Sequence, residues 1–225
     1  MKMPRKCSIC QEESHISTNS KFHPKDGSSS PKGTKMPKVE AEIEDTYTEA
    51  VLKEQYNLHK NYVKGRIESS TRLKISFRFP SIPEDISENI VKFIIQNKVG
   101  DKTSNWNCGR GDLFSKKEGK QECKCFTSDG PPSFTPSSEW DVIYFLDARG
   151  WLQDKFVLHR VNLKRTSEQW KNIKVNKSQT FDQQCQQTRR PRITWESLYP
   201  QIAEHCEQVF EGSFEEIFTS PATTE

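Results

Sequence analysis

Hydrophobic positions in the first third of the chain recur with two different periods. Over residues 41–66 the spacing is helical, and Gly65 marks a helix end; the apolar residues are Ile43, Tyr47, Val51, Leu58 and Tyr62. Over residues 73–79, Leu, Ile and Phe alternate with Lys, Ser and Arg, which predicts a half-buried strand that ends at Pro80. The pattern therefore predicts a long helix followed by a strand.

The middle of the chain predicts a helix and two further strands. Residues 84–97 carry an apolar stripe, and Pro83 suits the start of a helix. Residues 141–147 contain the run Val-Ile-Tyr-Phe-Leu, which is typical of a strand that is buried on both faces. Residues 155–163 predict another strand. This order of elements favours an α/β (α+β) fold with a mixed central sheet flanked by helices.

Two short helices and one longer helix are predicted in the second half of the chain. The short ones cover residues 136–140 and a stretch that Ser167 can cap. Residues 174–192 are mostly Lys, Gln and Arg. An amphipathic helix is then predicted over residues 195–210, where the apolar residues are Trp195, Leu198, Tyr199, Ile202, Cys206, Val209 and Phe210.

Two short strands joined by a polar turn carry the most chemically informative residues. Asp112 lies on the first strand, and Glu122 and Lys124 lie on the second. Because side chains alternate along a strand, Glu122 and Lys124 share one face, while the small residues Cys123 and Cys125 share the other. Two carboxylates beside an ammonium suit a hard divalent cation and a lysine that positions or deprotonates a water. The hairpin predicts metal-assisted phosphodiester hydrolysis.

The same hairpin also has a purely structural interpretation. Asp112 and Lys124 could form a cross-strand salt bridge in an ordinary sheet, with Glu122 in solvent. A second pattern of the same kind, Glu118-Gly119-Lys120, lies between the strands. Its composition is that of a turn without apolar neighbours, so we expect it to be solvated and mobile and exclude it as the site.

The composition of the chain indicates its domain organisation and its cellular location. The 225 residues carry a net charge of +3 and a mean hydropathy of -0.87, which fits one domain with an appendage and gives no bulk signal of nucleic-acid binding. No apolar run reaches the roughly 18 residues that span a membrane, and the basic N-terminus has no secretory signal. The seven cysteines lack disulfide-like spacing. We expect an intracellular protein, cytoplasmic or nucleoid-associated and not secreted.

The N-terminal residues 1–38 are rich in Lys, Ser, Pro and Gly and predict a flexible basic tail. Four residues within it could bind Zn²⁺ tetrahedrally: Cys7, Cys10, His15 and His23. The first three have the spacing of a zinc knuckle, a small module that grips single-stranded nucleic acid. Ser20 occupies the fourth position of that pattern, so His23 would replace it through a longer loop. The alternative is a tail with incidental Cys and His residues.

The order of helix, Asp-bearing strand, hairpin, Glu-x-Lys strand and buried strand resembles the core of the PD-(D/E)XK nuclease superfamily. Type II restriction endonucleases belong to this superfamily, and the resemblance covers about residues 84–163. It implies that Asp112, Glu122 and the backbone carbonyl of Cys123 bind Mg²⁺. It also implies that Lys124 orients or activates the attacking water and stabilises the developing phosphorane charge.

The resemblance includes one further candidate and two departures. Glu88, on the preceding helix, sits where many relatives place an extra acidic ligand; its alternative is a solvated glutamate on the polar face. Gly111 stands where the family motif has proline. The family fold also places a crossover helix after the Glu-x-Lys strand, and Gly130-Pro131-Pro132 leaves room for only one or two turns there.

A nuclease of this kind also needs groups that hold DNA. Residues 164–194 supply Lys and Arg for phosphates and guanine edges and Gln for adenine edges. The candidates are Lys164, Arg165, Lys174, Lys177, Gln183, Gln184, Gln187, Arg189, Arg190 and Arg192. The alternative is a polar, solvent-exposed loop.

Cleavage of both DNA strands usually requires two active sites, so a homodimer about a two-fold axis is expected. The long N-terminal helix or the C-terminal helix could form the interface. For the C-terminal helix we favour packing within one subunit.

The sequence as a whole predicts a Mg²⁺-dependent endonuclease of the type II restriction class that cleaves specific double-stranded DNA. Its organisation is a tail over residues 1–38, a nuclease domain over residues 39–218 and a frayed end over residues 219–225. The nuclease domain comprises a catalytic core, about residues 84–163, and a DNA-reading segment, residues 164–194. The alternatives are a repair or recombination nuclease of the same fold and a non-catalytic zinc-knuckle protein that binds nucleic acid.

Overall fold

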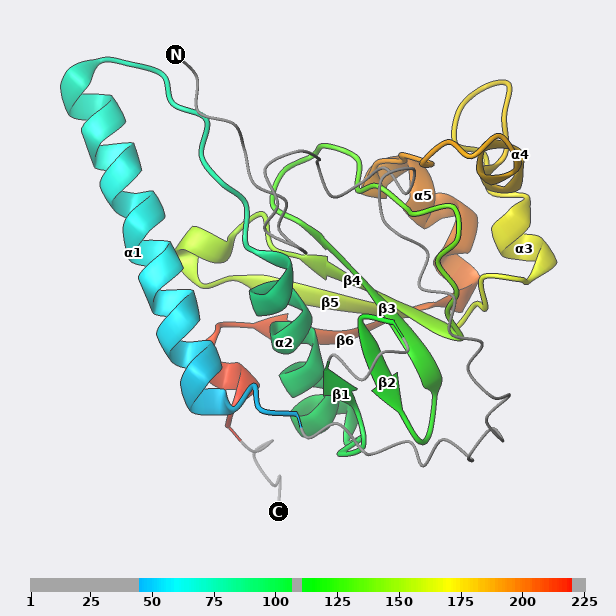
Figure 1. Cartoon of the computed structure of the whole chain (residues 1–225), viewed down its shortest axis with the longest axis horizontal. Coiled ribbons are helices and arrows are strands. Elements are labelled where there is room, and N and C mark those ends of the chain that lie inside the picture. The colour runs from blue at the N-terminus through cyan, green and yellow to red at the C-terminus, as the bar shows by residue number, and fades with distance from the viewer. Residues whose placement is uncertain (1–44, 107–110, 220–225) are drawn as a thin grey trace, which may run out of the picture. The chain divides into compact units, whose positions relative to one another are not determined.

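The computed structural model describes residues 45–106 and 111–219 (Figure 1). The predicted N-terminal tail lies outside the described residues, as do residues 220–225. The four Zn²⁺ candidates therefore lie outside them too: Cys7, Cys10, His15 and His23.

A six-stranded mixed sheet forms the centre of the described structure, and its strands follow one another in sequence order. They are β1 (Asn105–Trp106), β2 (Leu113–Ser115), β3 (Gly119–Phe126), β4 (Val142–Asp147), β5 (Phe156–Val161) and β6 (Cys206–Gly212). β3 and β4 run parallel, and the other neighbouring pairs are antiparallel. This mixed sheet with flanking helices confirms the fold class predicted from the sequence.

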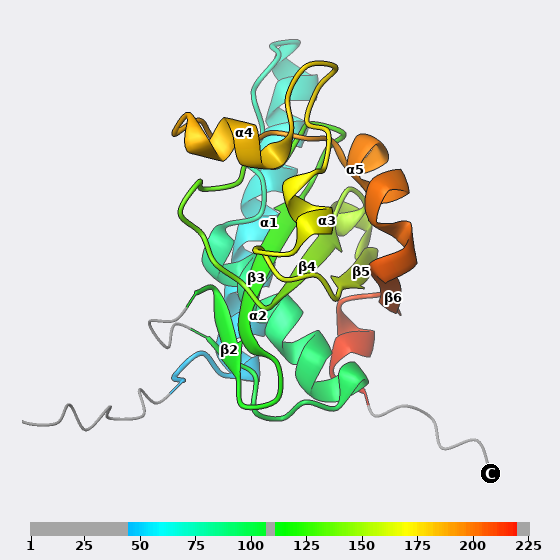
Figure 2. The same ribbon diagram turned by 90° about the vertical axis from the view of Figure 1, so that its right-hand side faces the viewer.

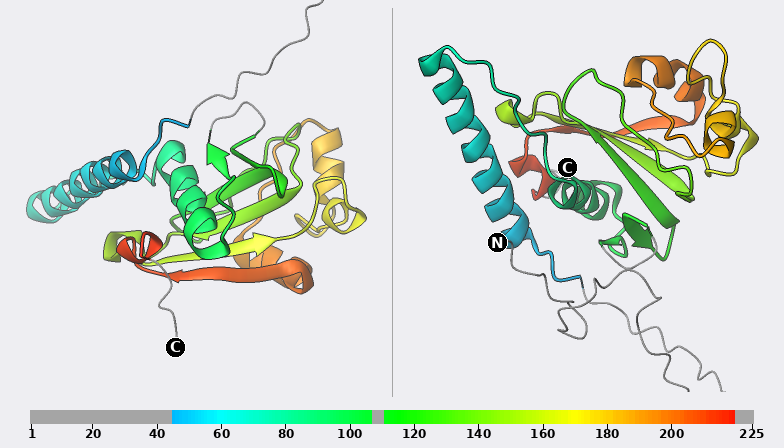
Figure 3. Two further views of the ribbon diagram at one scale, coloured as in Figure 1. Left: turned by 90° about the horizontal axis from the view of Figure 1, so that it is seen from below. Right: turned by 45° about the horizontal axis from the view of Figure 1, so that its top comes forward.

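Helices cover both faces of the sheet (Figures 2 and 3). One face carries α1 (Glu49–Leu73) and α2 (Glu84–Ile94), which continues as the π-helical turn η2 (Ile95–Val99). The other face carries α3 (Glu168–Lys171), α4 (Phe181–Gln186) and α5 (Trp195–Ile202). The described residues also form three short 3-10 helices: η3 (Trp151–Gln153), η4 (Ala203–His205) and η5 (Glu215–Ile217).

Two hydrophobic cores form, one on each face of the sheet. β4 contributes Tyr144 and Leu146 to the first core and Ile143 and Phe145 to the second. All four side chains are 0% exposed, as alternation along a strand between two covered faces requires. The near-continuous apolar run therefore forms a strand buried on both faces, as predicted.

α1 begins and ends later than the apolar pattern indicated. Thr48 caps its first turn by accepting a hydrogen bond from the Val51 backbone N–H (3.3 Å), and Lys74 ends it in the left-handed conformation. Gly65 does not end the helix but lies within it. The prediction of a helix end at Gly65 is therefore wrong.

The strand predicted over residues 73–79 is also wrong. After α1 the chain returns to α2 without regular structure (Figure 1), and Ile75 and Phe79 are 51% and 40% exposed. An alternating pattern forms a strand only where a neighbour takes up the backbone hydrogen bonds. No described strand lies beside this segment.

The amphipathic helix predicted over residues 195–210 is correct only as far as Ile202. α5 ends there, shortly after Pro200, which cannot donate a helical hydrogen bond. After η4 the chain forms β6, which pairs antiparallel with β5. Without β6, β5 would be an edge strand with free backbone groups, and these groups decide the conformation of the segment.

The connection from β3 to β4 crosses the sheet without a helix. Residues 127–141 contain turns and an isolated bridge, so the short helix predicted over residues 136–140 is wrong. Phe134 and Trp140 anchor the crossover because both rings pack against Trp170 in the second core. The packing of these two rings therefore holds the connection against the sheet, a role that a helix has in most parallel crossovers.

Candidate active site

The β2–β3 hairpin brings the predicted carboxylates together. Asp112 directly precedes β2, rather than lying within the strand, and Leu113 pairs with Gln121. The backbone N–H of Cys123 donates a 2.8 Å hydrogen bond to Asp112 Oδ2. The antiparallel register therefore holds the Asp112 carboxylate against the strand that carries Glu122.

The residue before Asp112 explains one departure from the family motif. Gly111 has φ of 125°, a conformation that glycine adopts readily and other residues rarely adopt. Proline is locked near a φ of about −65° and could not replace it in this backbone. The backbone conformation at this position therefore explains why glycine, rather than proline, precedes Asp112.

Glu122 and Lys124 form a partly buried ion pair on one face of β3, while Cys123 packs against the first core on the other. Lys124 Nζ lies 2.6 Å from Glu122 Oε1 and 3.2 Å from the Cys123 carbonyl oxygen. Burial acts to lower the pKa of Lys124, but the charges of Glu122 and Asp112 outweigh it and raise that pKa. The structural interpretation placed Glu122 in solvent, and this part of it is wrong, because the side chain is only 6% exposed.

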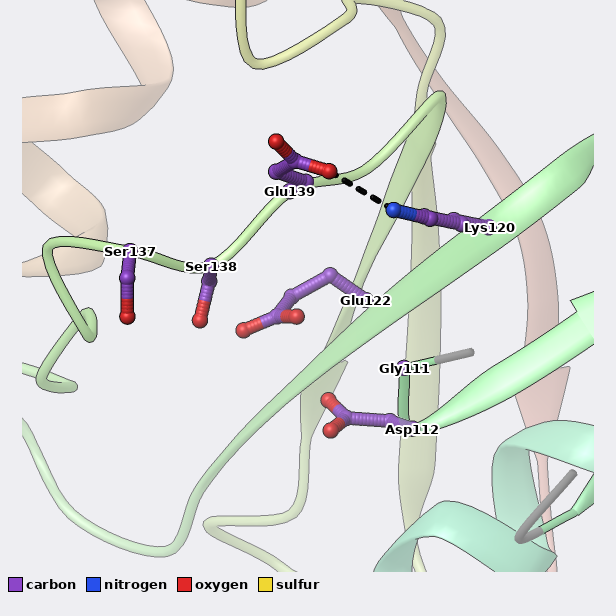
Figure 4. Close-up of a pocket in the computed structure, with 7 residues that line it drawn as sticks. All are labelled: Gly111, Asp112, Lys120, Glu122, Ser137, Ser138 and Glu139. Atoms are coloured by element: carbon purple, nitrogen blue, oxygen red, sulfur yellow. Dashed lines mark hydrogen bonds and ion pairs between the residues drawn. The ribbon is translucent and has the colours of Figure 1, made fainter. Parts of the chain in front are cut away.

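A cavity of about 420 Å³ opens beside the hairpin (Figure 4). Its lining residues are Gly111, Asp112, Lys120, Glu122, Ser137, Ser138 and Glu139. The Asp112 and Glu122 carboxylates project into it from the hairpin, and the other wall belongs to the crossover. Lys120 Nζ joins the two walls through a 2.7 Å ion pair with Glu139. The two predicted ligands thus share one open cavity.

A third carboxylate contributes to the electrostatics of this cavity. Burial and then the charge of Asp112 raise the pKa of Glu88 to about 7, although Trp106 Nε1 donates a 2.7 Å hydrogen bond to it. Burial also raises the pKa of Glu122; Lys124 opposes this rise and Asp112 adds to it. Glu88 is therefore not the solvated glutamate of the alternative interpretation. Carboxylates crowded in this way are stabilised by a bound cation.

Some residues of the cavity and its surroundings were not singled out from the sequence. Lys120 lies two positions before Glu122 on β3, so the same alternation could have placed it on this face. Ser138, which hydrogen-bonds Glu122, lies in the irregular crossover, where no periodic signal marks it. Trp106, which orients Glu88, lies in a strand of only two residues. Tertiary structure alone brings Ser138 and Trp106 to the site.

The second Glu-x-Lys pattern is not the site, but the reason differs from the one expected. Glu118 accepts a 2.7 Å hydrogen bond from the Tyr144 hydroxyl and forms a 2.7 Å ion pair with Arg160. Its side chain is 7% exposed, and Tyr144 belongs to the first core, on the face opposite Glu122. The expectation of a solvated, mobile Glu118 is therefore wrong, because Arg160 neutralises its charge inside the fold.

The donor atoms of the cavity fit a hard cation. The carboxylates of Asp112 and Glu122 and the carbonyl of Cys123 are the oxygen ligands that Mg²⁺ prefers. Within the described ranges, no three His, Cys, Asp or Glu side chains lie close enough to form a complete metal site. Mg²⁺ commonly takes one or two carboxylates and keeps several waters, so the present set is compatible with it.

Five of the predicted DNA-contacting residues have side-chain partners within the fold. Lys164 forms a 3.4 Å ion pair with Asp141. Arg165 is 9% exposed and lies over the rings of Phe181 and Trp140, which corrects its expected place on a DNA-reading surface. Gln183 completes the capping box of α4. Gln184 and Gln187 both hydrogen-bond Gln179. These contacts explain much of the glutamine content of the segment.

The remaining candidates are exposed cations: Lys174, Lys177, Arg189, Arg190 and Arg192. The backbone of Arg192 forms an isolated antiparallel β-bridge with that of Ser133. The Phe134 N–H also donates a 3.0 Å hydrogen bond to the Pro191 carbonyl. The arginine segment is therefore held against the crossover, whose later residues line the cavity.

No helix in the described ranges is long and apolar enough to cross a membrane.

Comparison with protein-family models identifies a family for this chain. The family model described as Bsp6I restriction endonuclease matches residues 47–202, which is more than half of the chain. No curated protein and no solved structure matches significantly. The matched residues include the hairpin, the cavity and the crossover, and the chain belongs to the Bsp6I restriction endonuclease family.

Proposed function

We propose that this protein is a Mg²⁺-dependent type II restriction endonuclease of the PD-(D/E)XK superfamily. It hydrolyses phosphodiester bonds at specific sites in double-stranded DNA and leaves 5′-phosphates. The observation that carries the proposal is the convergence of Asp112 and Glu122 on one cavity, with Lys124 paired to Glu122, inside the region matched by a restriction endonuclease family.

Each residue of the hairpin has a chemical role in this proposal. Asp112, Glu122 and the Cys123 carbonyl hold Mg²⁺, which when bound polarises the scissile phosphate and acidifies a water. Lys124 orients the attacking water and stabilises the charge that develops on the phosphorane. Glu88, oriented by Trp106, adds negative charge beside Asp112 and serves as the further acidic group of the cation site.

The exposed arginines supply the DNA contacts. Arg189, Arg190 and Arg192 form no ion pair with a described residue, so they are available for phosphates or guanine edges. Arg192 is bridged to Ser133 of the crossover, and later residues of the crossover line the cavity. Lys164, Lys174 and Lys177 add charge to the same part of the chain.

Cleavage of long duplex DNA tests the proposal. With Mg²⁺, the wild-type protein should yield discrete fragments, whereas a structure-dependent nuclease would cut branched substrates instead. Asp112→Asn is the sharpest variant, because the amide oxygen can still accept the Cys123 hydrogen bond while the charge is lost. It should lower the cleavage rate about 100-fold or more and leave DNA binding unchanged.

Lys124→Ala should behave in the same way, and Lys117→Ala is the matched control. Lys117 is an exposed lysine in the turn of the same hairpin, away from the cavity lining. Cleavage at the wild-type rate by Asp112→Asn or Lys124→Ala would refute the site. Loss of cleavage in Lys117→Ala as well would show that the hairpin variants act through folding rather than chemistry.

A further inference from the structure

Lys120 supplies the positive charge of the cavity that holds Asp112 and Glu122 (Figure 4). Among the described residues that line this cavity, Lys120 is the one cation, and the carboxylates are Asp112, Glu122 and Glu139. Such a lining repels a DNA phosphate unless a positive charge meets it. The proposed Mg²⁺ meets the scissile phosphate, and the ammonium group of Lys120 is left to attract a further phosphate.

Strand geometry sets the separation of Lys120 from the proposed cation site. Lys120 and Glu122 lie two positions apart on β3 and project from the same face, so their Cα atoms are about 6.6 Å apart. This separation is close to that of successive phosphates along one DNA strand. A phosphate held at the cation beside Glu122 therefore leaves its neighbour on the strand within reach of Lys120.

Asp141 holds the backbone of Lys120 in place. Its backbone N–H donates a 2.9 Å hydrogen bond to the Lys120 carbonyl, and its Oδ2 accepts a 3.1 Å hydrogen bond from the Lys120 N–H. This close approach requires Gly119, because a Cβ added there would collide with the Asp141 carboxylate. The backbone of Lys120 is thus fixed between β3 and the crossover, so a change of partner involves its side chain alone.

The partner of Lys120 in the free protein is a weak competitor for a phosphate. Lys120 Nζ lies 2.7 Å from Glu139 Oε2, and the two side chains are 39% and 72% exposed. An exposed ion pair contributes little to stability, because water screens it and two long side chains lose freedom. A DNA phosphate offers the same ammonium group a charged oxygen and releases condensed counterions when it binds. The exchange of Glu139 for a phosphate therefore replaces a weak contact with a stronger one.

We infer that Lys120 binds the DNA phosphate next to the scissile one, and that Glu139 occupies the place of this phosphate in the free protein. The inference rests on the proposed function, because it requires a phosphodiester at the cation site. A neighbouring phosphate keeps its charge throughout the reaction, so Lys120 binds the substrate and the transition state equally. Lys120 therefore determines how tightly DNA enters the cavity and leaves the rate of the chemical step unchanged.

Substitutions of the two partners should change DNA binding in opposite directions. In single-turnover cleavage with Mg²⁺, Lys120→Met should raise the protein concentration that gives half the maximal rate about tenfold, with the maximal rate within about threefold of the wild type. Lys120→Arg keeps the charge and should stay within about threefold of the wild-type concentration. Glu139→Gln should lower that concentration about threefold, because Lys120 is then free before DNA arrives. An ion pair that serves only the fold would shift Lys120→Met and Glu139→Gln in the same direction, and this result would overturn the inference.

The ion pair between Lys53 and Glu49 on α1 provides matched controls. Its two charged groups lie 3.0 Å apart, its side chains are 33% and 50% exposed, and neither residue lines the cavity. Lys53 also lies 3.3 Å from Glu215. Lys53→Met and Glu49→Gln should each leave the half-maximal concentration within about twofold of the wild type. Shifts as large as those at Lys120 and Glu139 would mean that net charge alone explains the effect, and would overturn the inference.

A neutral methylphosphonate identifies the phosphate that Lys120 binds. Once the cut is mapped, the phosphates on either side of the scissile one are replaced in turn. One replacement should raise the half-maximal concentration of the wild type about tenfold, and that of Lys120→Met less than about twofold, because the variant has already lost the contact. Equal effects on both proteins would overturn the inference and leave the proposed function standing. A wild type that cleaves no DNA would overturn the proposed function and this inference with it.

Discussion

Two Glu-x-Lys patterns lie four residues apart in one hairpin, and their surroundings are opposite. Glu118 is neutralised by Arg160 and hydrogen-bonded by Tyr144 and Gln121. Its charge is thus balanced by fixed groups in the first core. These contacts of Glu118 connect the turn of the hairpin to β4 and β5, which are distant from it in sequence.

Glu122, on the other face, lies among charges that are not balanced. Lys124 pairs with it, but Asp112 and Glu88 bring two more carboxylates to the same region. A carboxylate with a balanced charge stabilises the fold, whereas carboxylates beside an open cavity are available to the cation that the proposed function requires. The same three-letter pattern therefore indicates a site only when its electrostatic surroundings are known.

The contrast between Glu122 and Glu118 predicts its largest effect on the rate of DNA cleavage. Glu122→Gln should slow DNA cleavage about 1000-fold, or roughly 4 kcal/mol in the activation barrier, because a ligand of the proposed cation is lost. Single-turnover cleavage with Mg²⁺ measures it, and circular dichroism provides the folding control. A rate within tenfold of the wild type would erase the distinction between Glu122 and Glu118.

The converse substitution should act on stability. Glu118→Gln should lower the free energy of unfolding by about 3 kcal/mol, because the neutral amide leaves Arg160 with only the longer, 3.9 Å ion pair to Glu207 and turns an N–H₂ group towards donors. Urea unfolding measures the change. The folded variant should still cleave DNA at a rate close to that of the wild type. Strong loss of cleavage in stable, folded Glu118→Gln would mean that both carboxylates belong to the site.

Tyr144→Phe removes one of the hydrogen bonds that Glu118 accepts. It should cost about 1.5 kcal/mol, because the hydroxyl donates to a charged carboxylate that is shielded from water. Burial and then the Glu118 hydrogen bond raise the pKa of Tyr144 far above its ordinary value, so the hydroxyl keeps its proton. Urea unfolding of the single variants and of the double variant with Glu118→Gln should show less than additive losses. Additive losses would mean that the two groups act separately.

The smallest expected effect is that of the cation on stability. Mg²⁺ at about five times its dissociation constant should add roughly 1 kcal/mol and raise the melting temperature by about 3 °C. The rise should persist in Glu118→Gln and vanish in Asp112→Asn. Calorimetry with and without a chelator measures it. An equal rise in Asp112→Asn would place the cation elsewhere in the molecule.

The arrangement of the candidate site could be predicted from sequence because the relations between its central residues are local. A strand alternates its side chains, so Glu122 and Lys124 had to share a face, and a short hairpin had to bring Asp112 beside them. Cys123 and Cys125 could be placed on the opposite face by the same rule, and both pack against the first core. The alternation does not depend on the rest of the chain.

Other features could not be predicted because they depend on distant partners. Glu118 was expected in solvent, and it is buried because Arg160, 42 residues away, reaches it across the sheet. Residues 206–212 have a helical apolar spacing but form β6, because β5 offers an unpaired edge. Residues 73–79 have the spacing of a strand, yet no described strand lies beside them.

By itself, the sequence determined which residues of the hairpin share a face, which strand is buried on both sides and that α2 precedes the hairpin. These are consequences of periodicity, which acts over a few residues. The tertiary structure alone decided which carboxylates are neutralised, where Trp106 and Ser138 meet the site and which segments complete the sheet. These outcomes depend on burial and on charge, and both are set by residues that the chain brings together only when it folds.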